Sequence, residues 1–308
     1  MTIAHGSLEL RPAVCDDLPD VRGLLASSLD CDPDAASVLD VLAVGPYADP
    51  ELRLVATDGA TVLGVGIASV RPIDTDPVGH LDLLAVSPEH TRDGIGRRLL
   101  AALEERLRAR GAREIRVGGN APCYAWPGVD VRYTGMTQLL ESAGYVRLEG
   151  DRGEAVNMSV RLGGDPAWLD TAADEARLAA SGIEVRRLQP ADPAFAEFMT
   201  GWGPRLAWEV ERSAERPTSA CHVALRAGQF VAFACHHSNR AGWFGPMGTD
   251  ASMRRSGIGS VLLRRCLADM AAEGRTRADI AWVGPIGFYA RGVGARISRV
   301  FWLFGKDL

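Results

Sequence analysis

The pattern of hydrophobic and polar positions occurs twice along the chain. The segment from Ala85, AVSPEHTRDGIGRRLLAALEERLRARGAREIRV, aligns without gaps with the segment from Gly248, GTDASMRRSGIGSVLLRRCLADMAAEGRTRADI. Each segment predicts a strand, a short glycine loop, an amphipathic helix with apolar residues at i, i+3 and i+4, and a further strand. The helices are expected to end at Gly111 and Gly274, because glycine favours the left-handed conformation that closes a helix. We call these segments, with their flanking strands, the first copy and the second copy.

An apolar hairpin precedes the glycine loop in each copy. The hairpins LRLVATDGATVLGVGIASV and CHVALRAGQFVAFACHH have turn residues at Asp58-Gly59 and Ala227-Gly228. Each copy also opens with a short predicted strand, at residues 8–11 and 183–187. This order of elements predicts an α/β fold of two tandem domains, each with a central mixed sheet in an α+β arrangement flanked by helices.

The two copies are separated by a stretch rich in alanine and aspartate, Asp165–Ser181, which predicts a helical linker. A length of 308 residues also favours two domains. We therefore expect an N-terminal domain over residues 1–164, a linker over residues 165–182 and a C-terminal domain over residues 183–308.

Composition and charge exclude several kinds of partner. With 34 Lys and Arg against 39 Asp and Glu, the formal charge is −5, so nucleic acid and anionic membranes are repelled on average. Apolar stretches such as Val62–Val70 are far shorter than the roughly 20 residues that span a bilayer, and Met1–Leu8 does not look like a signal peptide. We expect a cytoplasmic protein that binds neither nucleic acid nor membrane, in an oligomeric state that the sequence does not indicate.

The six cysteines are scattered without a C-x-x-C pair, which argues against a zinc ribbon and against a disulfide framework. Cys235, His236 and His237 could be imagined as metal ligands. Adjacent residues of a strand, however, point to opposite faces of a sheet. We therefore expect no metal site.

A G-x-G loop before a helix exposes backbone N–H groups at a positive helix end, which can bind an anion, although such loops also serve tight packing. Neither copy has a Walker A sequence or the third glycine of a Rossmann fingerprint. The second loop, Arg254–Gly259, resembles the [RQ]-x-x-G-x-[GA] loop of the GNAT superfamily of acyl-CoA-dependent N-acyltransferases. The first loop keeps both glycines but has Thr91 where the family usually has Arg or Gln. The resemblance spans nearly the whole chain as two tandem copies.

This resemblance implies acetyl-CoA as the cofactor. Loop amides would hold its pyrophosphate, and a strand edge would pair with its pantetheine arm and stabilise the thioester oxyanion. In the second copy these positions are Met247, Gly248, Thr249, Arg254, Arg255, Ser256, Gly257, Ile258, Gly259 and Ser260. In the first copy they are Leu84, Ala85, Val86, Arg92, Asp93, Gly94, Ile95, Gly96, Arg97 and, after the next strand, Asn120. We expect tighter binding by the second copy, because the loop of the first copy contains the Asp93 carboxylate and its Thr91 brings no positive charge.

The two copies differ in their candidate acid and base. The segment Phe288–Arg291 resembles the family segment whose tyrosine protonates the departing thiolate, so Tyr289 is the predicted general acid. The first copy has Leu140 at this place, but its strand carries His80 and Asp82 on one face, where they could deprotonate an ammonium acceptor. The alternatives are that Tyr289 packs against its helix and that His80 and Asp82 are solvated surface residues.

The first copy has an extra segment before its last helix, near Ala121–Tyr133. Its Trp126, Asp130 and Tyr133 are candidates for an acceptor pocket, as is Trp243 in the second copy. A loop that only covers apolar surface would explain this segment equally well.

These features together predict an N-acetyltransferase that moves an acetyl group from acetyl-CoA to a primary amine of a small molecule by direct attack. We expect turnover in the second copy, with His80 and Asp82 as the competing site if the first copy is active. The alternative is an acyl-CoA-binding structural or sensory module in which one or both copies are inactive.

Overall fold

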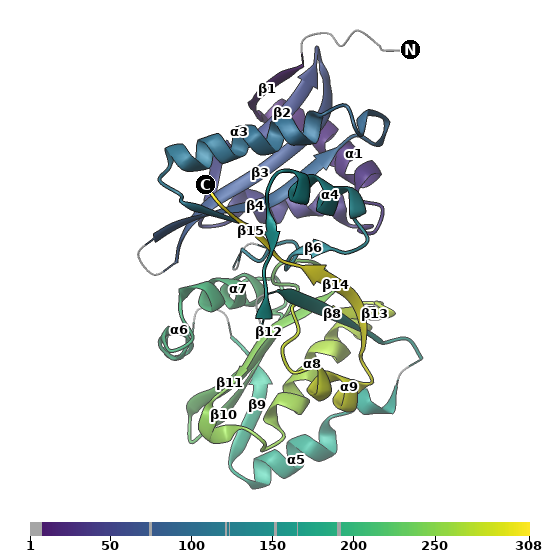
Figure 1. Cartoon of the computed structure of the whole chain (residues 1–308). Coiled ribbons are helices and arrows are strands. Elements are labelled where there is room, and N and C mark those ends of the chain that lie inside the picture. The colour runs from purple at the N-terminus through teal and green to yellow at the C-terminus, as the bar shows by residue number, and fades with distance from the viewer. Residues whose placement is uncertain are drawn as a thin grey trace. The chain divides into compact units, whose positions relative to one another are not determined.

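The chain forms two compact units (Figure 1), each with a mixed sheet and flanking helices as the sequence predicted. The computed structural model describes residues 8–308 except 74–75, 121, 123, 151–152, 165 and 190–191. The first unit consists of Met1–Ala155 and Val300–Leu308, and the second consists of Val156–Arg299. None of the helices among the described residues is long and apolar enough to cross a membrane.

The first unit has a seven-stranded sheet covered by helices on both faces. Its strands, in sheet order, are β1 (Glu9–Pro12), β2 (Ala48–Asp58), β3 (Thr61–Ile73), β4 (Asp76–Val86), β5 (Glu114–Val117), β15 (Phe304–Asp307) and β7 (Val146–Arg147). Its helices are α1 (Leu18–Ser28), α2 (Val38–Val44), α3 (Ile95–Ala109) and α4 (Thr134–Ser142). Leu54 of β2 shares a core cluster with Leu103 of α3, whereas Val55 shares another with Leu25 of α1. Successive strand residues therefore face opposite helical layers.

The second unit repeats this arrangement around a second sheet. Its strands, in sheet order, are β14 (Arg296–Trp302), β8 (Glu154–Arg161), β13 (Arg277–Ile280), β12 (Trp243–Thr249), β11 (Gln229–His236), β10 (Cys221–Arg226) and β9 (Ile183–Arg187). Its helices are α5 (Ala172–Ala180), α6 (Pro193–Thr200), α7 (Pro204–Ala214), α8 (Ile258–Ala272) and α9 (Ile286–Val293). The short β6 (Val129–Asp130) pairs with Phe301 and Trp302, the part of β14 that belongs to the first unit.

The second predicted hairpin turn and the predicted helix ends have the conformations that their residues favour. The first hairpin turns at Gly59 and Ala60, one residue later than predicted, because Asp58 still pairs with Thr61 in the sheet. Ala227 and Gly228 have φ values of 49° and 77°, which is the two-residue turn that suits an antiparallel hairpin. Gly111 and Gly274 follow α3 and α8 with φ values of 83° and 85°. The repeat seen in the sequence is therefore a repeat of backbone geometry.

The boundaries of the two units differ from the predicted division at residues 164 and 183. Strand β8 pairs with β13 and so belongs to the second unit, although it precedes the predicted linker. Strand β15 pairs with β5 and β7 and so belongs to the first unit. Backbone pairing between strands far apart in the sequence decides to which unit a strand belongs. The pattern of hydrophobic and polar residues along the chain does not indicate this pairing. The predicted linker contains α5, while Asp165 lies outside the described residues.

We expect Phe304→Ala to destabilise the protein by about 3–5 kcal/mol, the usual cost of removing a buried phenylalanine. Phe304 is 1% exposed and packs in the core of the first unit. The free energy of unfolding from urea denaturation measures the change, with Ile297→Ala as the control because Ile297 is 50% exposed. Equal losses in the two variants would contradict the role assigned to β15.

Candidate active site

Strand β4 separates from its parallel neighbour β5 halfway along its length. The two strands pair from Gly79–Ile115 to Leu81–Val117, and the Gly118 N–H donates to the Leu81 carbonyl at 3.0 Å. Beyond this point, the pairing of β4 among the described residues is with β3 alone. The two strands therefore open into a V, as the resemblance predicted for the pantetheine arm.

The backbone of β4 offers free hydrogen-bonding groups along this opening. The Ser87 N–H donates to the Leu63 carbonyl at 2.8 Å, so Ser87 is a hydrogen-bonded position of the β3–β4 pair. In an antiparallel pair such positions alternate with positions whose N–H and C=O groups point away from the partner strand. By that alternation Leu83 and Ala85 bond to β3, whereas the N–H and C=O groups of Leu84 and Val86 point into the opening. An extended amide chain can pair with such an edge.

A β-bulge lies where the two strands separate. Ile67 of β3 is opposite Leu83, and its neighbour Ala68 is opposite Leu81, so Asp82 is the extra residue of β4. A bulge of this kind bends the strand and redirects its side chain. It places the Asp82 carboxylate at the base of the opening.

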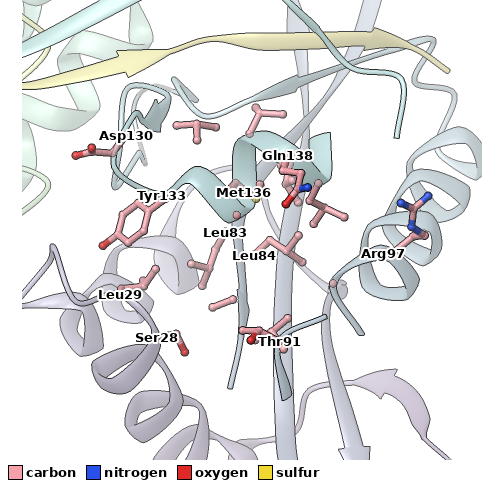
Figure 2. Close-up of a pocket in the computed structure, with 18 of the residues that line it drawn as sticks. Ser28, Leu29, Leu83, Leu84, Thr91, Arg97, Asp130, Tyr133, Met136 and Gln138 are labelled. Carbon is pink, nitrogen blue, oxygen red and sulfur yellow. The ribbon is translucent and has the colours of Figure 1, made fainter. Parts of the chain in front are cut away.

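A cavity of about 560 Å³ occupies this opening (Figure 2). Figure 2 shows side chains from the end of α1, from β4, from α3 and from α4 around it. Its lining includes these residues that the sequence singled out: Asp82, Leu84, Ala85, Val86, Arg92, Gly94, Gly96, Arg97, Trp126, Asp130 and Tyr133. The lining also includes residues that were not predicted, because the pattern of their elements indicates only helix packing: Ser28, Leu29, Met136, Gln138 and Ser142.

The glycine loop forms one end of this cavity. Arg92 and Gly94 have φ values of 71° and 81°, and α3 begins directly after them. The Arg98 N–H is the first to bond within the helix, to the Gly94 carbonyl at 3.0 Å, so the amides before it are left to other acceptors. A Cβ on Gly96 would lie 3.2 Å from Leu139 and 3.6 Å from Val86. Glycine therefore keeps the helix end open to a phosphate.

Asp82 has the electrostatics of a residue that exchanges protons near neutral pH. Its carboxylate accepts hydrogen bonds from Ser69 Oγ at 2.6 Å and from Asn120 Nδ2 at 3.1 Å. Burial raises the pKa of Asp82 to about 7, and the two hydrogen bonds and the Arg71 charge oppose this rise. Ser69 was not predicted as a site residue, although a single serine in the apolar strand β3 could have indicated it.

His80 and Asn120 lie close to Asp82 without lining the large cavity. His80 is 1% exposed and pairs in register with Ser69, which places both on the Asp82 face of the sheet. Asn120 is 3% exposed and its amide bonds Ser69 and Asp82. The geometry therefore makes Asn120 a residue that holds Asp82, and its predicted contact with the coenzyme stays a prediction.

The far end of the cavity from the loop carries the predicted acceptor residues. Asp130 is buried and forms an ion pair with Arg132 at 2.7 Å. The Tyr133 hydroxyl donates to Asp32 at 2.8 Å, which fixes the ring against the cavity (Figure 2). Trp126 lies in the core cluster beneath them. The described part of the extra segment thus forms a cavity wall, while its residues 121 and 123 lie outside the described residues.

The loop of the second unit has the same backbone conformation but different surroundings. Arg255 and Gly257 have φ values of 65° and 93°, at the positions of Arg92 and Gly94. The Arg177 guanidinium of α5 reaches 2.9 Å from where a Cβ on Gly257 would stand, and it donates to the Ser256 carbonyl at 3.4 Å. A side chain of the same unit therefore covers this loop.

The bulge of the second unit lacks the carboxylate. Met247 and Phe244 of β12 are opposite Ala234 and His236 of β11, so the bulge contains Gly245 and Pro246. Gly245 stands at the position of Asp82, and Trp243, at the position of His80, is buried in the sheet. The position that would supply a base in the second unit has no side chain.

Tyr289 packs into the core of the second unit. Its ring lies 5.0 Å from the Phe288 ring and 6.1 Å from the Phe244 ring, centroid to centroid. Burial raises the pKa of Tyr289 to about 12. A thiol has a pKa near 8.5. A tyrosine of raised pKa therefore donates a proton to a thiolate less favourably than a tyrosine with the reference pKa does. The acid role of Tyr289 stays a prediction.

A histidine pair lies elsewhere in the second unit. The possible ligand atoms of His236, His237 and Glu273 all lie within 4.8 Å of one another. The two histidines lie side by side because a φ of 60° at His237 turns its side chain back toward His236. The expectation that adjacent histidines diverge is thus wrong. The Gly242 N–H donates to His237 Nδ1 at 2.8 Å, so the ring proton is on Nε2, which donates to Glu273. That nitrogen has no lone pair for a metal ion.

The profile of the acetyltransferase (GNAT) family matches residues 27–124 and 188–295, which together make up more than half of the chain. These ranges contain both glycine loops and both bulges. No curated protein is similar enough in sequence to count as a relative.

Solved structures share the tandem fold at low sequence identity. A glucosamine N-acetyltransferase region of a fungal multi-domain GH3 β-N-acetylglucosaminidase has a TM-score of 0.77 and 20% identity, over 99% of this chain and 38% of that one. This chain therefore spans well under half of the fungal protein. An N-acetyltransferase from Sphaerobacter thermophilus has a TM-score of 0.67 and 18% identity, over 97% and 95% of the two chains.

A tandem GNAT protein from the clavulanic acid biosynthesis pathway also has a TM-score of 0.67, with 17% identity over 98% of each chain. Identities this low show the fold alone, whereas the family profile matches both copies in sequence. The predicted cofactor, acetyl-CoA, follows from the family. The chain belongs to the acetyltransferase (GNAT) family, as a tandem member with two family domains.

Proposed function

We propose that this protein transfers the acetyl group of acetyl-CoA to a primary amine of a small molecule, and that the reaction takes place in the cavity of the first unit. The observation that carries this proposal is the position of Asp82, at the bulge where β4 leaves β5 and on the wall of the cavity. The sequence favoured the second unit because of its more regular loop. The arrangement of side chains favours the first.

The residues present in the first unit fit acetyl-CoA. The amides at the start of α3, with Arg92 and Arg97, would hold the pyrophosphate at the cavity end where the described cations gather. The free backbone groups of Leu84 and Val86 would pair with the pantetheine amides. Acetyl-CoA, when bound, would supply an activated carbonyl carbon.

Asp82 would act as the general base. In its ionised form it can take a proton from an ammonium group at the base of the opening, which leaves a neutral amine with a lone pair for attack. The backbone N–H groups of β4 can stabilise negative charge on the carbonyl oxygen. The conjugate acid of a CoA thiolate has a pKa near 8.5, so the thiolate can leave without a general acid to protonate it. The first unit accordingly needs no tyrosine at the position of Leu140.

The charges of the cavity favour a cationic acceptor. Among the described lining residues, Arg92 and Arg97 belong to the loop end, while Asp82 and Asp130, the latter paired with Arg132, belong to the acceptor end. An ammonium group is attracted to such a site and a carboxylate is repelled. The fungal region of similar fold is named a glucosamine N-acetyltransferase, so an amino sugar belongs among the acceptors to be tested.

A second function, acyl-CoA binding without turnover, is favoured for the second unit. Its loop keeps the phosphate-binding backbone, while its bulge has Gly245 in place of the base. Thiol release from acetyl-CoA, measured with glucosamine, spermidine and phenethylamine, tests the overall proposal. Acetyl-CoA binding with no amine-dependent thiol release would support the binding module for the whole chain.

We expect Gly96→Val to raise the Kd for acetyl-CoA at least about tenfold, because the side chain would fill the space between the loop, Val86 and Leu139. The matched control is Gly259→Val, the same change at the same position of the second loop. Isothermal titration calorimetry gives affinity and stoichiometry for both variants. Weaker binding in Gly259→Val alone would move the reacting acetyl-CoA to the second unit.

We expect Asp82→Asn to lower kcat by about 10²–10⁴-fold with little change in the KM for acetyl-CoA, which is the usual loss when a general base is removed. Because the base must be ionised, wild-type kcat should rise with pH until the pKa of Asp82, about 7, is passed. Tyr289→Phe should keep wild-type kcat. The opposite pattern, with Tyr289→Phe inactive and Asp82→Asn unchanged, would restore the second unit as the reaction site.

A further inference from the structure

The proposed reaction leaves the protein with one proton to remove in each turnover. When an ammonium becomes an amide, its nitrogen forms a C–N bond and loses two protons, and one of these ends on the CoA thiol. The other passes to Asp82 and has to reach solvent before the next cycle. In the large cavity, acetyl-CoA and the acceptor would cover Asp82, so a separate route is needed.

A second cavity lies behind Asp82 in the first unit. Its volume is about 10 Å³, which is room for about one water molecule. Asp82 lines both cavities, and it is the one residue that their described linings have in common. The other residues around the small cavity are Leu42, Gly45, Tyr47, Ala48, Asp49, Arg53, Ile67, Ala68, Ser69 and Asn120.

Two buried polar atoms on this wall have no hydrogen-bond partner among the described residues, Oδ1 of Asn120 and Nε of Arg53. The orientation of the Asn120 amide is fixed, because its Nδ2 faces the Asp82 carboxylate at 3.1 Å and a carboxylate oxygen needs a donor. Oδ1 is therefore an acceptor and Arg53 Nε a donor. Buried polar groups are satisfied in native proteins, often by an internal water.

We propose that the small cavity holds one ordered water, bonded to Asn120, Arg53 and Asp82, and that this water carries the proton of Asp82 out to solvent. The inference rests on the proposed function of Asp82. An internal water commonly makes about three hydrogen bonds, and this wall offers a donor, an acceptor and the carboxyl group itself.

The relay step conserves atoms and charge. An N–H bond of the ammonium breaks as an O–H bond forms on Asp82. That O–H bond then breaks as the water oxygen takes the proton, and another O–H bond of the same water breaks to pass a proton outward. The carboxylate and the water are both restored, and one proton has entered bulk solvent.

The outer wall of the small cavity leads to the surface. Tyr47, Asp49 and Arg53 are half-buried, and the Asp49 side chain is 31% exposed where it bonds Arg110. The Arg71 charge of β3 acts on Asp82, and His80 of β4 lies on the same face of the sheet. Arg53 and Asp49 of β2 line the small cavity. A proton leaving the water therefore has a short path away from the covered side of Asp82.

A crystal structure of the protein with acetyl-CoA, at a resolution that shows waters, tests the site without any acceptor. We expect one water within hydrogen-bond distance of Asn120 Oδ1, Arg53 Nε and the Asp82 carboxyl group. The same structure of Arg53→Met should lack it, because the donor is gone. A dry cavity in the wild-type protein would overturn the proposal.

Kinetics test the relay. With the amine of the panel that reacts fastest, Arg53→Met should lower kcat roughly tenfold and enlarge the D₂O effect, with the KM for acetyl-CoA unchanged. Arg53→Lys, which retains a donor, should recover most of the rate. If Asp82→Asn is inactive while Arg53→Met keeps wild-type kcat, pH profile and D₂O effect, the relay is wrong and the base stands. If Asp82→Asn is fully active, the base is wrong and the relay falls with it.

Discussion

Within the part of the chain that the structure describes, strand β4 pairs on one side only beyond Leu81, whereas an inner strand of a regular sheet pairs on both sides. This loss of pairing leaves backbone donors and acceptors facing a space that a ligand can fill. The bulge, the cavity and the start of α3 are arranged around the same separation. The unpaired edge of β4 is thus the constraint on which the candidate site depends, and the helices on both faces of the sheet keep it rigid.

The two units show how a duplicated fold can keep its backbone while its chemistry changes. Both loops have left-handed residues at corresponding positions, and both fourth strands carry a bulge. At the bulge the first unit has Asp82, held by Ser69 and Asn120, where the second has Gly245. The conformation of the main chain is therefore a poorer guide to activity than the side chains that meet at the bulge.

Local pattern predicted the hairpins, the helix ends at Gly111 and Gly274, and both loops, because each depends on residues that are near one another in the sequence. It also indicated Asp82, since the residue stands on the strand before the loop. Ser69 was not predicted, because its role depends on a hydrogen bond from β3 to Asp82 of β4, and the sequence near Ser69 does not indicate that bond. The sequence favoured the second copy as the reaction site because its glycine loop matches the family pattern better. The Arg177 side chain that lies over this loop comes from a helix far earlier in the chain, so the loop sequence does not indicate it.

Strand β15 lies between β5 and β7 in the first sheet, although the whole second unit is synthesised before it. During translation the first unit consequently leaves the ribosome with a missing strand, and the edges of β5 and β7 remain available to other chains. Its sheet closes only when residues 304–307 emerge. Completion of the first sheet is thereby coupled to synthesis of the second unit, so a chain that stops within the second copy lacks the strand that lies between β5 and β7.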